Sequence, residues 1–348
     1  MRIAIDAMGG DHAPEEIVRG ACDAAPQVPG ATLVLVGQTD RVQAALAACG
    51  PRPRNLEIQQ AGEVIEMHED PRRALLRKRD SSTHIGLGLV KHARADAFIS
   101  AGNTGALVGG ATVPVFGLGC LEGVKRPAIA VPMPTENGFS ALVDAGANKE
   151  CKPIHLLQWA VMGSVYIKYL RKEITEPTVA LLNIGEERNK GTALIQEAYA
   201  LLEKSHLKFI GNIEPHKLFS GKADVVVCDG FTGNVFLKTS EGLSNFLMGM
   251  IRSNGLSESE DIRRGISKIE QRTDYSSVGG APLLGVRGIV LKCHGRSKAR
   301  AVVNAILIAA GFVKDRLNDH IVEELKSEGH VGWFSGWWHK AKEEPDAP

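Results

Sequence analysis

Residues 1–14 read MRIAIDAMGGDHAP, in which an apolar strand runs directly into a glycine turn. The run from Ile3 to Ile5 is typical of a strand buried in a parallel sheet, and such strands point their carboxyl ends into the crevice where α/β proteins bind ligands. Paired glycines let the backbone approach an anion closely. The segment therefore predicts either a phosphate site or a tight turn without a ligand. The candidate phosphate-site residues here are Asp6, Gly9, Gly10 and Asp11.

Strands and helices alternate along the rest of the chain, which predicts an α/β fold with a Rossmann-like, mainly parallel sheet and helices on both faces. No repeat or low-complexity linker divides residues 1–330, so we expect one domain. The strands expected are 2–6, 32–36, 56–59, 97–101, 128–131, 141–143, 179–182, 208–210, 225–227 and 289–291. The main helices expected are 15–25, 154–170, 191–202 and 299–310.

Composition excludes some functions. With 41 Lys and Arg against 40 Asp and Glu, the formal charge is +1, so no overall field attracts nucleic acid. The six cysteines form no C-x-x-C pair, and no signal peptide is recognisable at the N-terminus. We expect a cytoplasmic protein with reduced thiols.

Two segments are candidates for membrane contact. Residues 232–272 have helical periodicity and no strand, which predicts a projecting helical hairpin used for membrane contact, dimer packing or both. The tail, residues 331–348, combines Trp with Lys, as at a lipid headgroup boundary, although it could equally fold back onto the body. The candidate membrane-contact residues are Phe246, Leu247, Met250, Ile251, Trp333, Trp337 and Trp338.

Four glycine-rich polar segments each follow an expected strand, at 100–105, 144–148, 183–191 and 229–234. If the strands are parallel, these loops share one edge of the sheet and offer donors to an anion. The edge is rich in donors and lacks paired metal ligands, which favours phosphate or a developing oxyanion over a metal. The candidate residues in these loops are Asn103, Thr104, Gly105, Asp144, Asn148, Lys190, Asp229, Thr232, Gly233 and Asn234.

Common catalytic motifs are absent: there is no Walker A sequence, no H-E-x-x-H, no G-x-S-x-G and no G-x-G-x-x-G after the first strand. These absences disfavour nucleotide triphosphatases, zinc hydrolases and serine hydrolases. A basic run follows Pro71 with helical spacing and is either a solvated face or a docking patch for an acidic protein. Its residues are Arg72, Arg73, Arg77, Lys78 and Arg79.

Several of these segments occur together in one known family. The motifs are DAMGGDHAP (6–14), SAGNTGAL (100–107), RPA (126–128), DAGAN (144–148), MGSVY (162–166), DGFTGN (229–234) and GGAPLLG (279–285). From Met1 to about Ala310 the chain resembles the bacterial acyl-[acyl-carrier-protein]:phosphate acyltransferases, the fatty acyl phosphate synthases of phospholipid synthesis.

The resemblance implies a fold like those of isocitrate dehydrogenase and phosphotransacetylase, a homodimer, and peripheral attachment to an anionic membrane surface at the inner face of the cell membrane. It implies that inorganic phosphate attacks the thioester of a long-chain acyl carrier protein, without metal or other cofactor. The acyl phosphate would pass to a membrane glycerol-3-phosphate acyltransferase, toward phosphatidic acid. The family's catalytic lysine and asparagine fall on Lys190 and Asn234.

Two features depart from the family pattern. The expected hairpin tip around 248–256 is short and polar, and the Trp-rich tail is additional, so the tail could replace the tip in membrane contact. Two other functions stay open. One is a phosphotransacetylase-like enzyme that uses a short acyl-coenzyme A, and the other is a non-catalytic membrane-associated scaffold that binds acyl ligand and phosphate.

Overall fold

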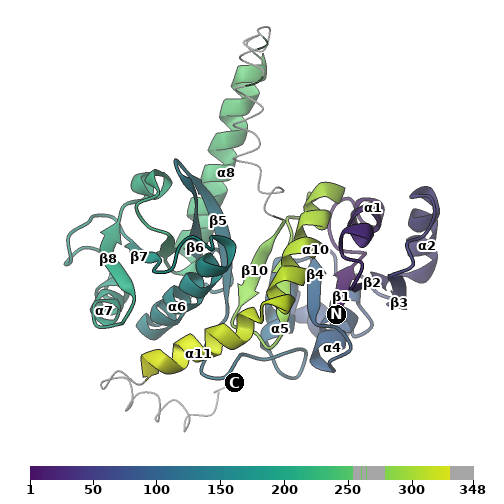
Figure 1. Ribbon diagram of the computed structural model, residues 1–348, viewed down its shortest axis with the longest axis horizontal. Helices are drawn as coiled ribbons and strands as arrows, with labels where there is room; N and C mark the ends of the chain where they lie inside the picture. Colours follow the sequence, from purple (N-terminus) through teal and green to yellow (C-terminus); the bar gives the residue numbers. More distant parts are fainter. Residues whose placement is uncertain (254–259, 261–263, 265–278, 330–348) are drawn as a thin grey trace.

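The computed structural model describes residues 1–253, 260, 264 and 279–329 (Figure 1). Within this part of the chain, eleven strands form one sheet in the order β3-β2-β1-β4-β11-β10-β5-β6-β9-β7-β8. The strands are β1 (Arg2–Asp6), β2 (Thr32–Gly37), β3 (Leu56–Gln60), β4 (Ala97–Ser100), β5 (Ala128–Thr135), β6 (Gly138–Val143), β7 (Thr178–Leu182), β8 (Lys208–Ile213), β9 (Val225–Val227), β10 (Ala281–Leu284) and β11 (Ile289–Lys292).

Helices cover both faces of this sheet, as expected, because successive residues of each central strand are buried on opposite sides. On β1, Ile3 and Ile5 pack into one core cluster, while Ala4 between them packs into another. The first core is covered by α1 (Glu15–Ala24), α2 (Thr39–Ala48), α6 (Pro153–Leu170), α7 (Ala193–Leu202), α10 (Ala299–Lys314) and α11 (Leu317–Gly329). The second is covered by α4 (Ser82–Lys91), α5 (Thr104–Thr112) and the base of α8 (Gly230–Ser253).

Strand direction reverses within the sheet. β10 is antiparallel to both β11 and β5, and β5 is antiparallel to β6. Consequently β6, β9, β7 and β8 run opposite to β3, β2, β1, β4 and β11. The expectation that the four glycine-rich loops share one edge is therefore wrong: the loop after β4 leaves one edge, and those after β6, β7 and β9 leave the other.

The reversal follows from one short connection, because β10 is antiparallel to both neighbours and leaves β11 and β5 parallel. A turn at Glu136 and Asn137 joins β5 directly to β6, so this pair must be antiparallel. β10 was not among the expected strands, because its four residues include a proline and follow Gly279 and Gly280, features typical of a loop. Because β10 fills the space between β11 and β5, it joins the two halves of the sheet.

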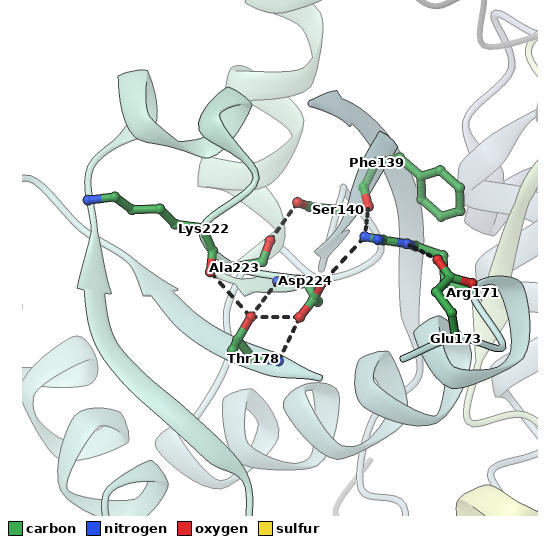
Figure 2. A network of polar contacts seen from close by, with 8 residues as sticks. All are labelled: Phe139, Ser140, Arg171, Glu173, Thr178, Lys222, Ala223 and Asp224. Atoms are coloured by element: carbon green, nitrogen blue, oxygen red, sulfur yellow. Dashed lines mark hydrogen bonds and ion pairs between the residues drawn. The ribbon is translucent and has the colours of Figure 1, made fainter. Parts of the chain in front are cut away.

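A network of hydrogen bonds and ion pairs connects the amino-terminal parts of β6, β7 and β9 (Figure 2). Asp224 accepts hydrogen bonds from the Thr178 backbone N–H (2.9 Å) and hydroxyl (2.7 Å), and it pairs with Arg171 at 3.3 Å. Ser140 on β6 donates to the Ala223 carbonyl at 2.6 Å. The network connects the end of α6 to three strands, on the edge opposite the loops that follow these strands.

The long helix α8 projects away from the sheet (Figure 1). It corresponds to the first half of the expected hairpin, and Leu243, Phe246, Leu247 and Met250 are exposed on it. Most of the expected second half and the whole Trp-rich tail, with Trp333, Trp337 and Trp338, lie outside the described residues. Within the described part of the chain, no helix combines the length and apolar character needed to cross a bilayer.

Candidate active site

A cavity of about 770 Å³ lies where the two halves of the sheet meet, on the face covered by α5 and the base of α8. Its apolar wall comes from three elements: Val108 of α5, Ile129 and Val131 of β5, and Leu237 of α8. Its polar part includes Lys238 of α8 and Lys292 at the end of β11. The cavity can therefore hold a molecule with one apolar and one anionic part.

The β4–α5 loop presents two of the predicted residues, Thr104 and Gly105, to this cavity. Asn103 itself does not line it. The Asn103 side chain caps α5 by accepting from the Ala106 N–H at 3.0 Å, and its amide donates to the carbonyls of Glu66, Met67 and Glu69. Asn103 thus fixes the loop that positions its neighbours.

Asp144 stabilises the loop after β6 through hydrogen bonds to the backbone of that loop. Its buried carboxylate accepts from four backbone N–H groups, at Ile129, Gly146, Ala147 and Asn148, and from the Asn148 side chain. Burial raises the pKa of Asp144, whereas these hydrogen bonds lower it. Asp144 and Asn148 do not line the cavity, but the backbone that they fold, residues 145–147, does.

Asn234 reaches the cavity from the first turn of α8. Asp229 caps this helix by accepting from the Thr232 N–H (2.9 Å) and hydroxyl (2.6 Å). Gly233 is required because a Cβ there would lie 2.0 Å from the Asp144 carbonyl oxygen. The resulting close approach brings the Asn234 side chain against Gly146, while Asp229, Thr232 and Gly233 stay outside the lining.

The first-strand turn contributes less to the cavity than expected. Asp6 is buried and accepts hydrogen bonds from the Ser100 hydroxyl (2.7 Å) and the Met8 N–H (3.2 Å), and burial raises its pKa. Asp6, Gly9 and Gly10 do not line the cavity, but Asp11 does. The Asp11 N–H donates to the Gly295 carbonyl at 2.8 Å, so the turn supports a second loop.

Lys190 lies outside the cavity, on the loop after β7. Its backbone carbonyl accepts from the Asn183 side chain at 3.0 Å, and its own N–H donates to Glu187 at 3.1 Å. The side chain is exposed and runs alongside Gly185. Because β9 separates β7 from β6, this loop is two strands away from the Asp144 loop.

The end of β11 and the β11–α10 loop, residues 293–298, were not among the expected site segments. Lys292, His294 and Ser297 line the cavity, and burial lowers the pKa of His294. The sequence does contain a pattern from which this loop could have been predicted. A polar K-C-H-G-R-S-K segment lies between an expected strand and an expected helix, the same arrangement that identified the other four loops.

The basic run forms the short helix α3 (Pro71–Arg77) and the residues just after it, beside α5. Lys78 pairs with Glu69 at 2.6 Å, and Arg79 stacks 4.8 Å from the Phe116 ring centroid. Arg72, Arg73 and Arg77 are exposed. Pro71 packs close to Gly105, which places the exposed cations near one side of the cavity.

No group of three or more His, Cys, Asp or Glu side chains is arranged to hold a metal ion among the residues that the structure describes. The polar atoms of the cavity instead belong to amines, amides, hydroxyls and backbone groups, to the His294 imidazole and the Arg296 guanidinium, and to the carboxylates of Asp11 and Glu241. Glu241 pairs with Lys238 at 2.7 Å.

Comparisons with known proteins agree with this architecture. Residues 1–320 match the family model described as "Fatty acid synthesis protein". A "Phosphate acyltransferase" from Heliobacterium modesticaldum is 46% identical over 336 residues, covering 93% of this chain and 98% of that protein. A "Phosphate acyltransferase" from Myxococcus xanthus is 46% identical over 316 residues, covering 88% of each chain.

Solved structures with a similar fold share little sequence. A phosphotransacetylase from Streptococcus pyogenes superposes with a TM-score of 0.59 at 17% identity, covering 90% of this chain and 94% of the other. A branched-chain phosphotransacylase from Enterococcus faecalis gives a TM-score of 0.55 at 13% identity, covering 90% and 99%. At this level of identity the likeness concerns the fold.

Proposed function

This chain belongs to the fatty acid synthesis protein family and is a phosphate acyltransferase, and from this premise we propose that it forms acyl phosphate from a long-chain acyl-[acyl-carrier-protein] and inorganic phosphate. The observation that supports the proposal is the composition of the cavity, which has an apolar wall beside an amine and an amide. The wall suits a fatty acyl group, and the polar part suits phosphate and a developing oxyanion.

The reaction requires little activation of the nucleophile. A phosphate oxygen attacks the thioester carbonyl, the carbonyl oxygen becomes an oxyanion, and the carbon–sulfur bond then breaks to release the carrier thiol after protonation. Because phosphate is already anionic near neutral pH, the enzyme contributes mainly by positioning it and stabilising the oxyanion. Asn234 is the proposed oxyanion donor, because its side chain lines the cavity beside the Asp144 loop.

Lys190 remains the second proposed catalytic residue, from its position in the family motif. Its proposed role is to orient phosphate or transfer the proton. Its exposed position outside the cavity requires that its loop approach the bound substrates or that it act from a second copy of the chain. The proposed homodimer is compatible with the second arrangement.

Two surfaces are assigned partners within this proposal. The exposed arginines of α3 would receive the acidic carrier protein next to the cavity. The apolar residues of α8 (Phe246, Leu247, Met250 and Ile251), together with the Trp-rich tail, would contact an anionic membrane from the cytoplasmic side. Membrane contact would bring the acyl phosphate close to the membrane glycerol-3-phosphate acyltransferase that consumes it, toward phosphatidic acid.

The direct test is acyl phosphate formation from a long-chain acyl carrier protein and inorganic phosphate, with acetyl-coenzyme A assayed in parallel. Product from the long-chain carrier alone supports the proposal. Product from acetyl-coenzyme A alone indicates a phosphotransacetylase, and no product from either indicates a non-catalytic binding protein.

A further inference from the structure

Lys292 is the last residue of β11, next to the centre of the sheet, and its side chain lines the cavity. The Nζ donates to the backbone carbonyls of Ala101 (3.3 Å) and Cys293. An ammonium group has three donors, and the two carbonyls account for two of them. These bonds hold the amine at the junction between the β4 and β11 loops.

The ammonium has no salt-bridge partner among the described residues. Three titratable groups favour the charged form of Lys292: Asp6, Asp11 and Cys293. The ammonium of Lys238, which also lines the cavity, opposes it. Asp6 is already hydrogen-bonded to Ser100 and to the Met8 N–H. Burial lowers the pKa of Lys292 to about 8, so the amine is still mainly protonated at neutral pH.

A glycine turn lines the cavity beside Lys292. Gly279 and Gly280 have φ values of +77° and +136°, and both line the cavity. A Cβ on Gly280 would lie 3.3 Å from the Lys292 carbonyl oxygen, so this turn lies directly on the end of β11. A Cβ on Gly279 would lie 2.4 Å from the Asn304 carbonyl carbon, so the absence of both side chains lets this turn pack closely against α10 and the end of β11, beside the amine.

The nearby helix end is a weaker candidate for the same role. The Ala299 N–H, at the start of α10, already donates to the Glu16 carboxylate at 2.8 Å. This carboxylate occupies the position that an anion would take at the helix N-terminus and repels a second one. Lys292 is therefore the better placed donor.

We propose that the Lys292 ammonium binds the phosphate substrate, at the cavity end formed by the Gly279–Gly280 turn and the β11–α10 loop. This inference rests on the proposed function and moves the phosphate site away from the Gly9–Gly10 turn. The apolar wall of the cavity then remains for the acyl group, and Asn234 faces the cavity from the other half of the sheet.

The test compares Lys292→Met and Lys292→Arg with the control Lys298→Met. The control removes the same charge six positions away, at an exposed residue outside the cavity. With saturating acyl carrier protein, Lys292→Met should raise the KM for phosphate by about ten- to a hundredfold, the usual effect of losing a charged hydrogen bond. Lys298→Met should leave this KM unchanged, and the KM for the acyl carrier should not change in either variant.

The pH profile provides a second measurement that does not depend on the Met variant folding. In the wild type, the KM for phosphate should rise as the pH passes 8, because the amine loses its proton. In Lys292→Arg, where the cation persists, the rise should be absent. Identical profiles in the two proteins would overturn the inference.

The two proposals can fail separately. If the wild type turns over phosphate and Lys292→Met keeps the wild-type KM for phosphate, the phosphate site is wrong and the proposed function stands. If the wild type makes no acyl phosphate, the proposed function fails, and stabilisation against heat by inorganic phosphate tests the site alone. Stabilisation of the wild type but not of Lys292→Met supports the site, and equal or no stabilisation rejects it.

Discussion

Polar residues in the glycine-rich loops serve two different purposes. Asn103, Asp144 and Asp229 direct their side chains to backbone N–H groups and fix the loops, whereas Thr104 and Asn234 line the cavity. All these residues come from the same motifs, so residue type and spacing do not separate the two groups. Which residues reach the cavity depends on the hydrogen bonds of their neighbours.

At this scale, Asn234→Ala and Lys190→Ala are the direct tests of the proposed catalytic roles. Loss of an oxyanion donor or a proton-transfer group should lower kcat by about a hundredfold or more. Steady-state kinetics on variants with wild-type melting temperatures measure this effect. Asn137→Ala and Lys222→Ala, both exposed and outside the cavity lining, are matched controls. Near-normal kcat in either test variant would remove that residue from the mechanism.

The elements themselves were largely predictable from apolar patterning. β9 was predicted with its observed bounds, and α6, buried at every position from His155 to Ile167, was found from its long apolar run. β10 was not predicted, because a short strand with proline gains its identity from pairing with β5 and β11 rather than from its own residues. The error in strand direction, and with it the misplaced shared edge, came instead from the unrecognised turn between β5 and β6, because β10 is antiparallel to both neighbours and leaves β11 and β5 parallel.

The start of α6 predicts a pH effect on stability. His155 accepts the Lys152 N–H at 3.0 Å, and burial lowers its pKa to about 4. Between pH 6.5 and 4 the unfolded chain binds a proton that the folded chain does not, so stability falls as the pH falls. At pH 5 this loss is at most about 2 kcal/mol.

Urea unfolding at pH 7 and pH 5 measures this loss. His155→Gln should reduce the difference in unfolding free energy between the two pH values, and the exposed His320→Gln should not. An unchanged difference in His155→Gln would show that other groups cause the acid sensitivity.

The network of Figure 2 predicts a stability effect without a catalytic one. Asp224→Ala leaves the Thr178 N–H without its acceptor and removes the less exposed ion-pair partner of Arg171, which should lower the unfolding free energy by about 2–3 kcal/mol. Glu173→Ala removes only the exposed partner of Arg171 and should change stability little. Urea unfolding compares the variants, and the KM values should stay at the wild-type level. A stable Asp224→Ala protein would show that the network is dispensable.

At the scale of the whole molecule, the surfaces around the cavity decide which partners reach it. Reversing charge at Arg72, Arg73 and Arg77 should raise the KM for the acyl carrier about tenfold, with less effect at high salt. Initial rates at two ionic strengths measure the KM for the acyl carrier and its dependence on salt. Reversal at Arg41, Lys208 and Lys314, which are exposed on other elements, is the control. Equal KM values in both triple variants would exclude α3 as the docking site.

The projecting helix α8 makes a separate prediction. Phe246→Ser with Leu247→Ser should markedly reduce co-sedimentation with anionic vesicles, because two exposed apolar side chains are lost. Val115→Ser, an exposed apolar residue outside α8, is the control. Unchanged sedimentation together with a smaller oligomeric state than that of the wild type would instead assign this face of α8 to contact between copies.

The position of β11 between β4 and β10 has a consequence for synthesis of the chain. Ile289 pairs with Ala97 on β4, and Asp11 is hydrogen-bonded to Gly295, so the loop after the first strand and the loop after the last strand line the same cavity. A chain still on the ribosome has every cavity-lining residue only after Ala301 has been added. The cavity is therefore complete only after β11 and the start of α10 have been synthesised.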